Sequence, residues 1–497
     1  MAEADSARAQ LFERAKARIA GLDRHFIGGQ WIAQDGEPIA VINPADEQIV
    51  GQIAAGTAQE VDLAVRAARA AFDRPDWQAM PAARREQLLL RLADLIEADA
   101  DEIAAIETLD NGMPFAHARG AVGGAVSAIR YHAGWVRRLG GETVPMSVPG
   151  NWHGYTTRDP LGVAALIVPW NAPFAITCSK LSAALAAGCT VVLKPAELAP
   201  LTGLRLAQLV EEAGFPAGTV NVVTGLGPQA GAALVAHPGV DKISFTGSTA
   251  TGQGILRESI ADLKRVSLEL GGKSAVLVFA DADLEKAVPG VAMGIFGNSG
   301  QVCAAGSRLF VADAIFDRFM AALADFAAKL RLGPGWQDGV AMGPLISQRQ
   351  RERVLGYVEA GKREGASLLT GGSAPAGHGY FVEPTIFVGA RADMTIVREE
   401  IFGPVLSVMR FSDEDFETLA RSANDSVYGL SAYVWTRDLE TAHSMAKKLR
   451  AGSVKVNGAG MEFALPFGGF RQSGLGREHG RMGVEAFTET KAVMIGY

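Results

Sequence analysis

The sequence predicts an α/β fold with two mostly parallel, doubly wound sheets. Between 163 and 270, short apolar strands recur at intervals of roughly 20–30 residues with a helix-like segment between them, which requires right-handed crossovers. The same alternation begins again after Gly272. The chain of 497 residues is also too long for one ordinary hydrophobic core, so its length favours two or three domains.

The segments before residue 160 do not belong to this alternation. The N-terminus mixes charged residues with alanines and predicts a surface helix, because Glu3, Asp5 and Glu13 argue against a transit peptide. Short runs punctuated by glycine and proline predict a small β lead-in over 25–53. Apolar residues at helical spacing predict helices over 61–72, 84–99, 100–110 and 120–139. A stretch rich in Gly, Pro and Thr predicts a hairpin over 140–160 that leaves the globule.

The first alternation predicts strands over 164–168, 190–194, 220–223, 242–245 and 265–270, with helices over 174–187, 202–213, 228–236 and 248–259. Nucleotides bind beyond the carboxyl ends of such parallel strands. Four short motifs lie there: PWN (169–171), KPAE (194–197), TG (224–225) and FTGS (245–248). We therefore expect a nucleotide site at this edge of the sheet.

The second alternation predicts strands over 275–279, 308–312, 405–411, 431–436 and 453–457, with helices over 315–331, 413–422 and 438–450. A further helix leads from the first of these strands to the loop that carries Cys303. Within this half, 345–378 predicts a helix, a strand and a glycine-rich loop. The last segment, 486–497, predicts one more strand with no sequential partner.

The composition excludes several classes of partner. Hydrophobic residues make up 48% and charged residues 20%, which with 58 glycines is typical of a soluble α/β enzyme. The net charge of −7 leaves no electrostatic footprint for nucleic acid or an anionic membrane, and no apolar run approaches the roughly 18 residues of a membrane span. Three cysteines without a pairing pattern favour a reducing, cytoplasmic compartment. The histidines are scattered, so we expect no metal site.

One of the three cysteines lies in a loop that could present a nucleophile. The stretch FGNSGQVCAAGS places Cys303 between Gly300 and Gly306, where the backbone can approach a ligand. Unpaired cysteines are usually small core hydrophobes, and we keep that interpretation for Cys178 and Cys189. The segment LELGGK places the carboxylate of Glu269 in an apolar run that ends at two glycines.

Seven motifs resemble, in order and together, those of the aldehyde dehydrogenase superfamily: PWN, KPAE, FTGSTATG, LELGGK, GQVCAAGS, EEIFGPV and PFGG. The resemblance covers almost the whole chain. It implies two Rossmann-like domains, with 1–138 and 160–270 binding NAD and 271–480 forming the catalytic domain. It also implies that 139–159 and 481–497 form an oligomerisation arm in a dimer or tetramer.

The resemblance implies oxidation of an aldehyde through a covalent intermediate. A thiolate at Cys303 would form a thiohemiacetal, pass hydride to NAD and leave a thioester that water must hydrolyse. Glu269 is the candidate general base, since apolar walls can raise the pKa of a carboxyl group toward neutrality. The oxyanion donors would be the Cys303 N–H and the Asn171 amide. Lys180 and Glu478 resemble the proton-relay pair of the family, with an ordinary ion pair as the alternative.

The cofactor residues are predicted at the sheet edge. Gly247 to Gly252 follows a strand and opens a helix whose N-terminus attracts phosphate, although Gln253 excludes a P-loop. Lys194 and Glu197 suit an adenosine ribose, and the carboxylate would repel a 2'-phosphate, which favours NAD over NADP. The expected contacts are Val168, Pro169, Trp170, Lys194, Glu197, Gly227, Phe245, Gly247, Ser248, Leu270, Glu400 and Phe402.

The predicted substrate pocket departs from the family pattern. Ala172, Ser179 and Gly297 are small where relatives often carry bulky residues. The pocket, with Val302 and Phe467, should therefore favour a bulky hydrophobic aldehyde that is aromatic, cyclic or terpenoid. Further apolar walls are expected from Phe174, Phe296 and Phe463.

Two other functions stay open at this point. A CoA-acylating semialdehyde dehydrogenase is disfavoured, because such enzymes usually dispense with the base that Glu269 would supply. A non-catalytic nucleotide-binding structural protein is disfavoured because Cys303, Glu269 and Asn171 are all intact.

Overall fold

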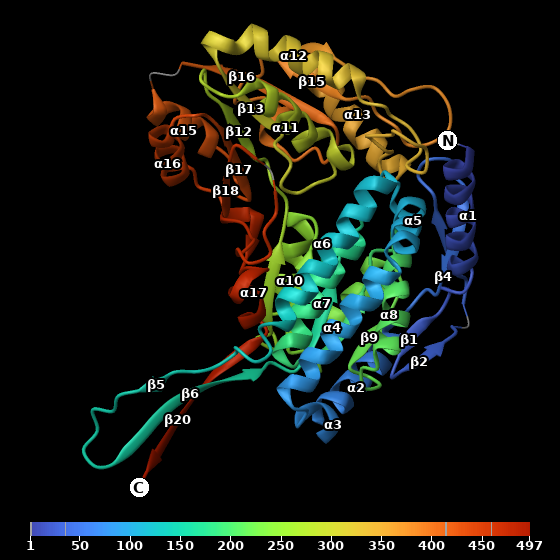
Figure 1. Cartoon of the computed structure of the whole chain (residues 1–497), viewed down its shortest axis with the longest axis vertical. Helices are drawn as coiled ribbons and strands as arrows, with labels where there is room; N and C mark the ends of the chain where they lie inside the picture. Colours follow the sequence, from blue (N-terminus) through green and yellow to red (C-terminus); the bar gives the residue numbers. More distant parts are fainter. Residues whose placement is uncertain (1, 35, 413–414, 459) are drawn as a thin grey trace.

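Two large sheets and a projecting ribbon organise the chain (Figure 1). The computed structural model describes residues 2–34, 36–412, 415–458 and 460–497. Within these ranges the first sheet has eight strands, in the order β19 (Gly474–Leu475), β11 (Arg265–Glu269), β10 (Lys242–Thr246), β7 (Val163–Ile167), β8 (Thr190–Lys194), β9 (Val220–Val222), β1 (His25–Ile27) and β2 (Gln30–Ile32). The strands β7 to β11 run parallel, as predicted, and the chain changes direction across the sheet between β7 and β10.

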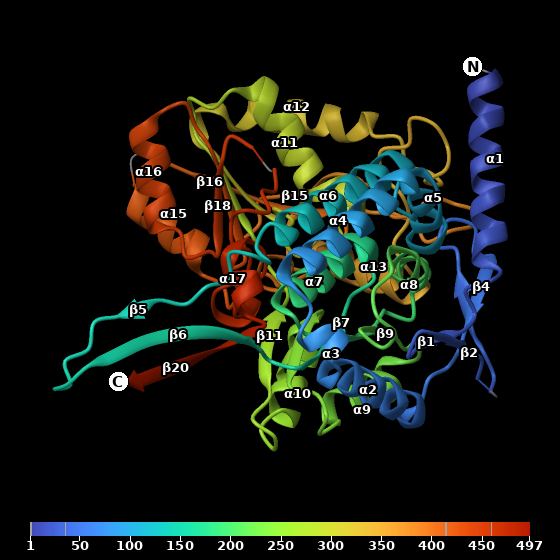
Figure 2. The same cartoon turned by 60° about the horizontal axis from the view of Figure 1, so that its bottom comes forward.

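Helices cover both faces of the first sheet, and successive strand residues enter opposite cores. On β7, Ala164 and Leu166 pack into one core and Ala165 and Ile167 into the other, because neighbouring strand residues point to opposite faces. Figure 2 shows the two layers above and below the sheet. The upper layer contains α4 (Ala82–Ala98), α5 (Ala100–Asn111), α6 (Phe115–Ala133), α7 (Pro173–Ala187) and α8 (Leu201–Ala213), and the lower contains α2 (Ala58–Asp73), α9 (Ala232–Ala236) and α10 (Thr249–Glu258).

The second sheet is also mostly parallel. Its order is β14 (Ser367–Thr370), β15 (Thr385–Val388), β16 (Val405–Phe411), β13 (Arg308–Ala312), β12 (Ala275–Val278), β17 (Ser431–Trp435) and β18 (Ser453–Val456). Only β14 pairs antiparallel among the strands described in this sheet. The helices are α11 (Leu284–Phe296) and α12 (Phe316–Lys329) on one core, α15 (Phe416–Asn424) and α16 (Leu439–Lys448) on the other, and α13 (Gln348–Arg363) and α14 (Thr395–Arg398) beside β15. The predicted helix over 413–422 has its first two residues outside the described ranges.

The predicted hairpin and the C-terminal strand meet in the projecting ribbon. β20 (Thr488–Gly496) pairs antiparallel with β6 (Trp152–Pro160) along its whole length, and β5 (Thr143–Val144) continues the ribbon on the other side. The ribbon leaves the body at its lower edge in Figure 1. α17 (Gly480–Glu485) leads the chain back to it. The unpaired C-terminal strand of the sequence therefore finds its partner more than three hundred residues earlier in the chain.

Two predicted helices differ from the structure, and two elements were not predicted. The helix expected over 120–139 begins at Phe115 and ends at Ala133, because packing offsets the low helix propensity of its glycines and Gly134 closes its last turn. The helix expected over 228–236 begins with a π-turn, Gly227–Gly231, before α9. β15 and α14 were not predicted. The N-terminal helix α1 (Ala2–Ile19) is not wholly exposed, because it buries Leu11 and Ile19.

The remaining elements are short, namely β3 (Ile39–Ile42), β4 (Ile49–Ile53), α3 (Pro75–Gln78) and the 3-10 turns Gly297–Gly300, Asp313–Ile315 and Arg471–Ser473. The strand β19 lies inside the predicted catalytic domain, yet it pairs with β11 of the first sheet. The domain boundaries stay a prediction, and this pairing brings the segment that carries Glu478 back to Glu269.

Among the described residues, no helix is both long and apolar enough to cross a membrane.

Candidate active site

The loop before Cys303 follows a conformation that few side chains tolerate. Asn298, Ser299 and Gly300 all have positive φ, of 49°, 56° and 72°. A non-glycine residue in this region costs about 1–2 kcal/mol, so the surroundings must stabilise the turn. The amide of Asn298 donates to the Asn171 carbonyl at 2.7 Å, and the Ser299 hydroxyl donates to the Gly343 carbonyl at 2.7 Å. The loop is therefore fixed in advance of any ligand.

Hydrogen bonds also anchor both sides of Cys303. The Asn171 side-chain amide donates to the Gln301 carbonyl at 2.8 Å, and the Gln301 side chain accepts from the Ile346 N–H at 2.9 Å. The hydroxyl of Tyr433 donates to the Ala304 carbonyl at 2.9 Å. An asparagine amide carries two N–H groups, so one of them remains beyond the bond to Gln301. The side chain of Asn171 therefore contacts the loop that carries Cys303.

The two glycines of LELGGK lie just after β11, in close contact with the Cys303 loop on one side and with Glu400 on the other. A Cβ on Gly272 would lie 2.4 Å from the Cys303 carbonyl oxygen, and one on Gly271 would lie 2.3 Å from Glu400 Oε2. The Gly272 N–H donates to Glu400 Oε1 at 2.9 Å. Real Cβ contacts are never this short, so no larger residue fits at either glycine without displacing the loop or the carboxylate.

Glu269 is the last residue of β11 and is almost fully buried, at 3% exposure. Neither carboxylate oxygen has a hydrogen-bond partner, and a Cβ on Gly468 would lie 2.7 Å from Oε1. Burial, and then the charge of Glu478, raise the pKa of Glu269 well above its ordinary value, against the opposing effect of Lys180. The carboxyl group therefore holds a proton more strongly than a solvated glutamate does.

Cys303 is the only one of the three cysteines, all of which lie in the described ranges, that is not fully buried. Burial, together with the charges of Glu400 and Glu269, raises the pKa of its thiol to about 12. Cys178 and Cys189 lie in the core, which agrees with the interpretation of them as small hydrophobes.

Lys180 and Glu478 form a mostly buried ion pair, with the ammonium in direct contact with Glu478 Oε1. Lys180 comes from α7, and its Nζ also donates to the Ser244 hydroxyl at 2.9 Å. Glu478 is held by two backbone hydrogen bonds of 2.7 Å that it exchanges with Phe467. The predicted relay pair, Lys180 and Glu478, is thus assembled from segments almost three hundred residues apart.

The predicted cofactor residues gather at the carboxyl ends of the first-sheet strands. Lys194 ends β8, and its Nζ lies 2.9 Å from Glu197 Oε2. Glu197 Oε1 also accepts from the Gly227 N–H at 3.4 Å. Burial lowers the pKa of Lys194, whereas Lys194 holds the pKa of Glu197 below its ordinary value although burial opposes it. Ser248 caps α10 by accepting from the Thr251 N–H at 3.2 Å.

The segment before β16 of the second sheet contacts the carboxyl edge of the first sheet. The rings of Trp170 and Phe402 meet edge to face, with centroids 5.3 Å apart. Phe402 has a positive φ of 60°, which turns the segment between Glu400 and β16 toward the first sheet. The buried Val168, Phe245 and Leu270 lie behind these groups, and Pro169 and Gly247 lie at the surface between them.

The predicted substrate residues differ in exposure, and two of the predicted pocket walls need correction. A Cβ on Gly297 would meet only Met293, at 3.9 Å, and one on Gly120 or Gly123 of α6 would meet nothing within 4 Å. Ala172, Val302 and Phe467 are partly exposed, and Ser179 is buried. Phe174 and Phe296 were predicted as walls, but both are completely enclosed in the cores of the two sheets, because each helix end turns its ring inward.

Comparison with known proteins identifies the chain. The sequence profile of the aldehyde dehydrogenase family matches residues 31–493. The chain belongs to the aldehyde dehydrogenase family. It is 46% identical to the phenylacetaldehyde dehydrogenase of Pseudomonas fluorescens over 95% of both chains, and 44% identical to aldehyde dehydrogenase 1A1 of Ovis aries over 95% of this chain and 94% of that one.

Solved structures agree with this assignment. The NAD+ complex of the aldehyde dehydrogenase from Bacillus cereus superposes with a TM-score of 0.95, at 45% identity over 97% of this chain and 98% of that one. The predicted fold class is confirmed, and this enzyme is an NAD-dependent aldehyde dehydrogenase. Lys194 ends β8 and the capped start of α10 follows β10, so both lie at the sheet edge where dinucleotides bind in such folds.

Some residues near Cys303 in this aldehyde dehydrogenase were not predicted. Gln301 lies inside the GQVCAAGS motif, so its position gave a signal that the prediction did not use. Tyr433 gave none, since it reaches Ala304 from a strand more than one hundred residues later. Lys455, opposite Tyr433 on β18, has its Nζ 5.7 Å from the Tyr433 ring centroid.

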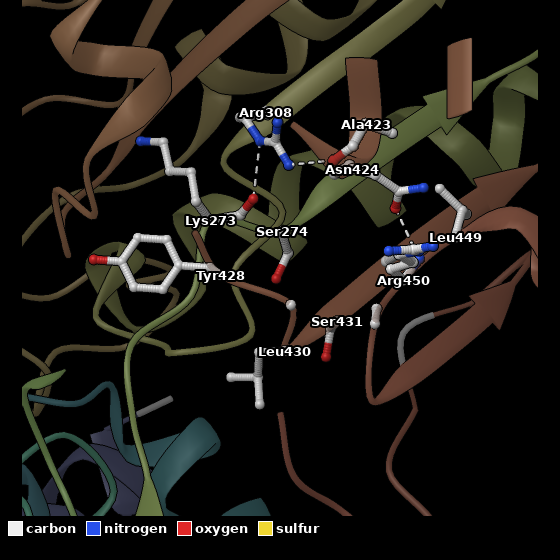
Figure 3. Close-up of a pocket in the computed structure, with 14 residues that line it drawn as sticks. Lys273, Ser274, Arg308, Ala423, Asn424, Tyr428, Leu430, Ser431, Leu449 and Arg450 are labelled. Carbon is white, nitrogen blue, oxygen red and sulfur yellow. Dashed lines mark hydrogen bonds between the residues drawn. The ribbon is translucent and has the colours of Figure 1, made fainter. Parts of the chain in front are cut away.

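A separate pocket lies behind the GGK turn (Figure 3). Arg308 crosses it and donates to the carbonyls of Lys273, at 2.9 Å, and Ala423, at 2.6 Å. The ammonium of Lys273 points away from the labelled residues on the other side, as Figure 3 shows. No predicted site residue lines this pocket. Its side chains, Arg308 among them, therefore stabilise the GGK segment and are assigned no part in binding. The described residues include no group of three or more His, Cys, Asp or Glu that could hold a metal ion.

Proposed function

We propose that this enzyme hydrolyses a Cys303 thioester with Glu269 as general base, and that its substrates are bulky hydrophobic aldehydes. One observation carries the first part. Neither carboxylate oxygen of Glu269 has a hydrogen-bond partner, although the side chain is buried at the end of β11, and its charge contributes to the raised pKa of the Cys303 thiol. A CoA-acylating enzyme has no use for an unpaired base at this position.

The first half of the reaction needs a thiolate and a place for the oxyanion. The sulfur of Cys303 attacks the aldehyde carbon, a C–S bond forms, and the carbonyl π electrons move to oxygen. The remaining N–H of the Asn171 amide and the backbone N–H of Cys303 donate to this oxyanion. NAD supplies the hydride acceptor that turns the adduct into a thioester.

The cofactor would be held by groups from both sheets. Lys194 and Glu197 would bind the adenosine ribose, and the N-terminus of α10 at Ser248 would face the phosphates. Glu400 would bind the second ribose, with Phe402 beside it. These roles are supported by position: Lys194 ends β8 and Ser248 follows β10 at the carboxyl edge of the first sheet, and Glu400 accepts from the Gly272 N–H just beyond β11.

The second half of the reaction releases the acid. Glu269 accepts a proton from water as the water oxygen adds to the thioester carbon, and the C–S bond then breaks to restore the Cys303 thiolate. A carboxylate with a raised pKa is a stronger base than a solvated one, which suits this step. The proton then passes to Glu478 and Lys180, so Glu269 is ready for the next cycle.

The substrate proposal rests on the space beside α6. Small residues at Ala172, Ser179 and Gly297 leave the pocket open, while Phe463 and Phe467 keep part of its wall apolar. A relative of 46% identity is a phenylacetaldehyde dehydrogenase. Buried apolar area contributes roughly 25 cal/mol per Å², so a large hydrophobic substrate gains more than a small one.

We expect phenylacetaldehyde to have a kcat/KM at least about tenfold higher than acetaldehyde, which corresponds to about 1.4 kcal/mol of transition-state binding. Ala172→Phe should reduce this ratio by slowing the large substrate most. The measurement is NADH formation at varied concentrations of both aldehydes. Ala172→Ser serves as a control that adds little volume and should keep the ratio. A wild-type preference for acetaldehyde would show that the pocket is not open.

Glu197 should set the preference for NAD over NADP. The carboxylate repels a 2'-phosphate, and at an effective dielectric near a protein surface this repulsion is on the order of a kcal/mol or more. Glu197→Ala should therefore raise the relative kcat/KM for NADP by about tenfold, measured with both cofactors at a fixed aldehyde concentration. Glu285→Gln removes an exposed carboxylate on α11 and should change nothing. An unaltered cofactor ratio in Glu197→Ala would assign the preference to other residues.

The projecting ribbon is proposed as an oligomerisation arm. Its exposed large side chains include Val144, Trp152, Met494 and Ile495, which a second copy of the chain could cover. Removal of residues 488–497 deletes β20 and leaves β6 unpaired, so we expect a smaller species or an insoluble chain. Light scattering with Tyr497→Ala as control would measure this, and an unchanged oligomer would contradict the proposal.

A further inference from the structure

Buried polar groups continue beyond the relay pair (Lys180 and Glu478) along one face of the first sheet. The Ser244 hydroxyl accepts from Lys180 Nζ at 2.9 Å and lies 3.3 Å from Glu478 Oε1. One strand away, the Ser267 hydroxyl is in direct hydrogen-bond contact with Lys242 Nζ. Ser244, Ser267 and Lys242 are all at most 5% exposed.

The strand register explains why these groups share one face. Residues two apart on a strand point the same way, so Lys242 and Ser244 on β10 lie beside Ser267 and Glu269 on β11. In this parallel pair Ser244 is the partner of Ser267, and Thr246 is the partner of Glu269. A polar row therefore runs from Glu269, at the carboxyl edge of the sheet, to Lys242 at the opposite end of the same strands.

A small cavity separates the relay pair from the outer part of this row. Its lining includes Ser179, Lys180, Ser244, Ser267 and Glu478. The space that admits a water-sized sphere is ≈ 10 Å³, which is about what one water molecule needs. The lining also includes the apolar Ala183, Ala486 and Phe487, so the hydrogen-bond partners open to a water there include Lys180, Glu478 and the serine hydroxyls. A water molecule in this cavity would therefore complete a hydrogen-bonded chain from the Lys180–Glu478 ion pair to Ser267.

The charges around Lys242 suit proton exchange near neutral pH. Burial lowers the pKa of Lys242 to about 8; the charge of Lys180 lowers it as well, and the charge of Glu478 raises it. Cys189 and Arg265 also face the ammonium, with opposite and smaller effects, and the Phe487 ring lies 5.5 Å from it. Both members of the relay pair are therefore electrostatically coupled to Lys242.

We propose that Lys242 and Ser267 carry the proton of thioester hydrolysis outward from the relay pair to the far end of the first sheet. The inference rests on the proposed hydrolytic function. In each cycle, neutral Lys242 takes the hydroxyl proton of Ser267. Ser267 takes a proton from the cavity water in return, and the relay pair then donates a proton to that water. Lys242 then releases the proton to solvent. Neither residue touches the reacting atoms, and both act through Glu478.

The test separates hydride transfer from hydrolysis in Lys242→Met. The pre-steady-state burst of NADH should keep its amplitude and rate, while the steady-state rate at neutral pH falls about tenfold. Imidazole, a small proton carrier that does not replace a structural side chain, should restore much of that rate. Lys242→Arg keeps the charge and most of the bulk but cannot release a proton near neutral pH, so it should be slow as well.

Controls distinguish this role from a structural one. Ser267→Ala should resemble Lys242→Met, whereas Ser267→Thr keeps the hydroxyl and should resemble the wild type. Lys264→Met removes another buried lysine, paired with Asp262 outside the polar row, and should leave the steady-state rate unchanged.

Three results would overturn the proposal. A wild-type steady-state rate in Lys242→Met or Lys242→Arg would do so, as would equal loss of burst and steady-state rate. A slow variant that imidazole does not accelerate would assign Lys242 a structural role instead. If Glu269→Gln itself hydrolysed the thioester normally, the underlying function would be wrong, and that result is independent of Lys242.

Discussion

Replacement of Cys303 by alanine should lower aldehyde oxidation at least about a thousandfold while NAD binding stays near normal. Cys178 cannot replace Cys303, because that thiol is enclosed in the core of the first sheet and burial raises its pKa well above the ordinary value. The cofactor is expected to bind mainly to the first sheet, whose carboxyl edge does not depend on the thiol. NADH absorbance measures the first effect, and titration calorimetry with NAD measures the second.

Cys178→Ala is the matched control for this variant. It removes a buried thiol of the same size, so it should reduce thermal stability and leave kcat close to the wild type. Undiminished turnover in Cys303→Ala would exclude the covalent mechanism. Loss of NAD binding together with turnover would show instead that the loop had collapsed, since Gly272 packs directly against the Cys303 carbonyl.

Much of the fold was predictable because its strands are buried on both sides. Such strands read as short apolar runs between helices, and the predictions for β7 to β13 were confirmed within one or two residues. β15 and β19 could not be predicted in the same way. They are short, and they become strands only because β16 and β11 offer them an edge. The ends of α6 likewise depend on packing against α4 and α7 rather than on propensity.

The sequence indicated which residues belong to the candidate site, but it could not indicate how their side chains are arranged. Motifs indicated Cys303, Glu269 and Asn171, but no pattern could show that both oxygens of Glu269 lack a partner. The direction of an aromatic ring at a helix end depends on the neighbouring core, which is why Phe174 and Phe296 were predicted wrongly as pocket walls. Lys242 lies in an ordinary strand pattern, and only the register of β10 on β11 connects it to the relay pair.

Glu269→Gln should separate the two halves of the reaction. Glutamine keeps the size of the side chain but cannot accept a proton, so the thioester forms and is not hydrolysed. We expect a burst of about one NADH per active site and then a steady-state rate at least about a hundredfold below the wild type. Stopped-flow absorbance measures both phases. Equal loss of the burst and the steady-state rate would contradict the assignment of Glu269 as the deacylation base.

The same variant should change how activity and stability depend on pH. The wild-type deacylation rate should rise with pH through the raised pKa of Glu269, and this rise should be absent in Glu269→Gln.

The folded pKa lies above the ordinary value of 4.5, so the folded state binds a proton that the unfolded state releases. The associated stability is complete below that ordinary value and is lost as pH rises through the folded pKa. Glutamine has no such loss, so the Tm of Glu269→Gln relative to wild type should increase as pH rises above 4.5, by about 1 °C for each pH unit up to the folded pKa. A Tm difference that does not change with pH above 4.5 would mean that the pKa of Glu269 is not raised in the folded enzyme.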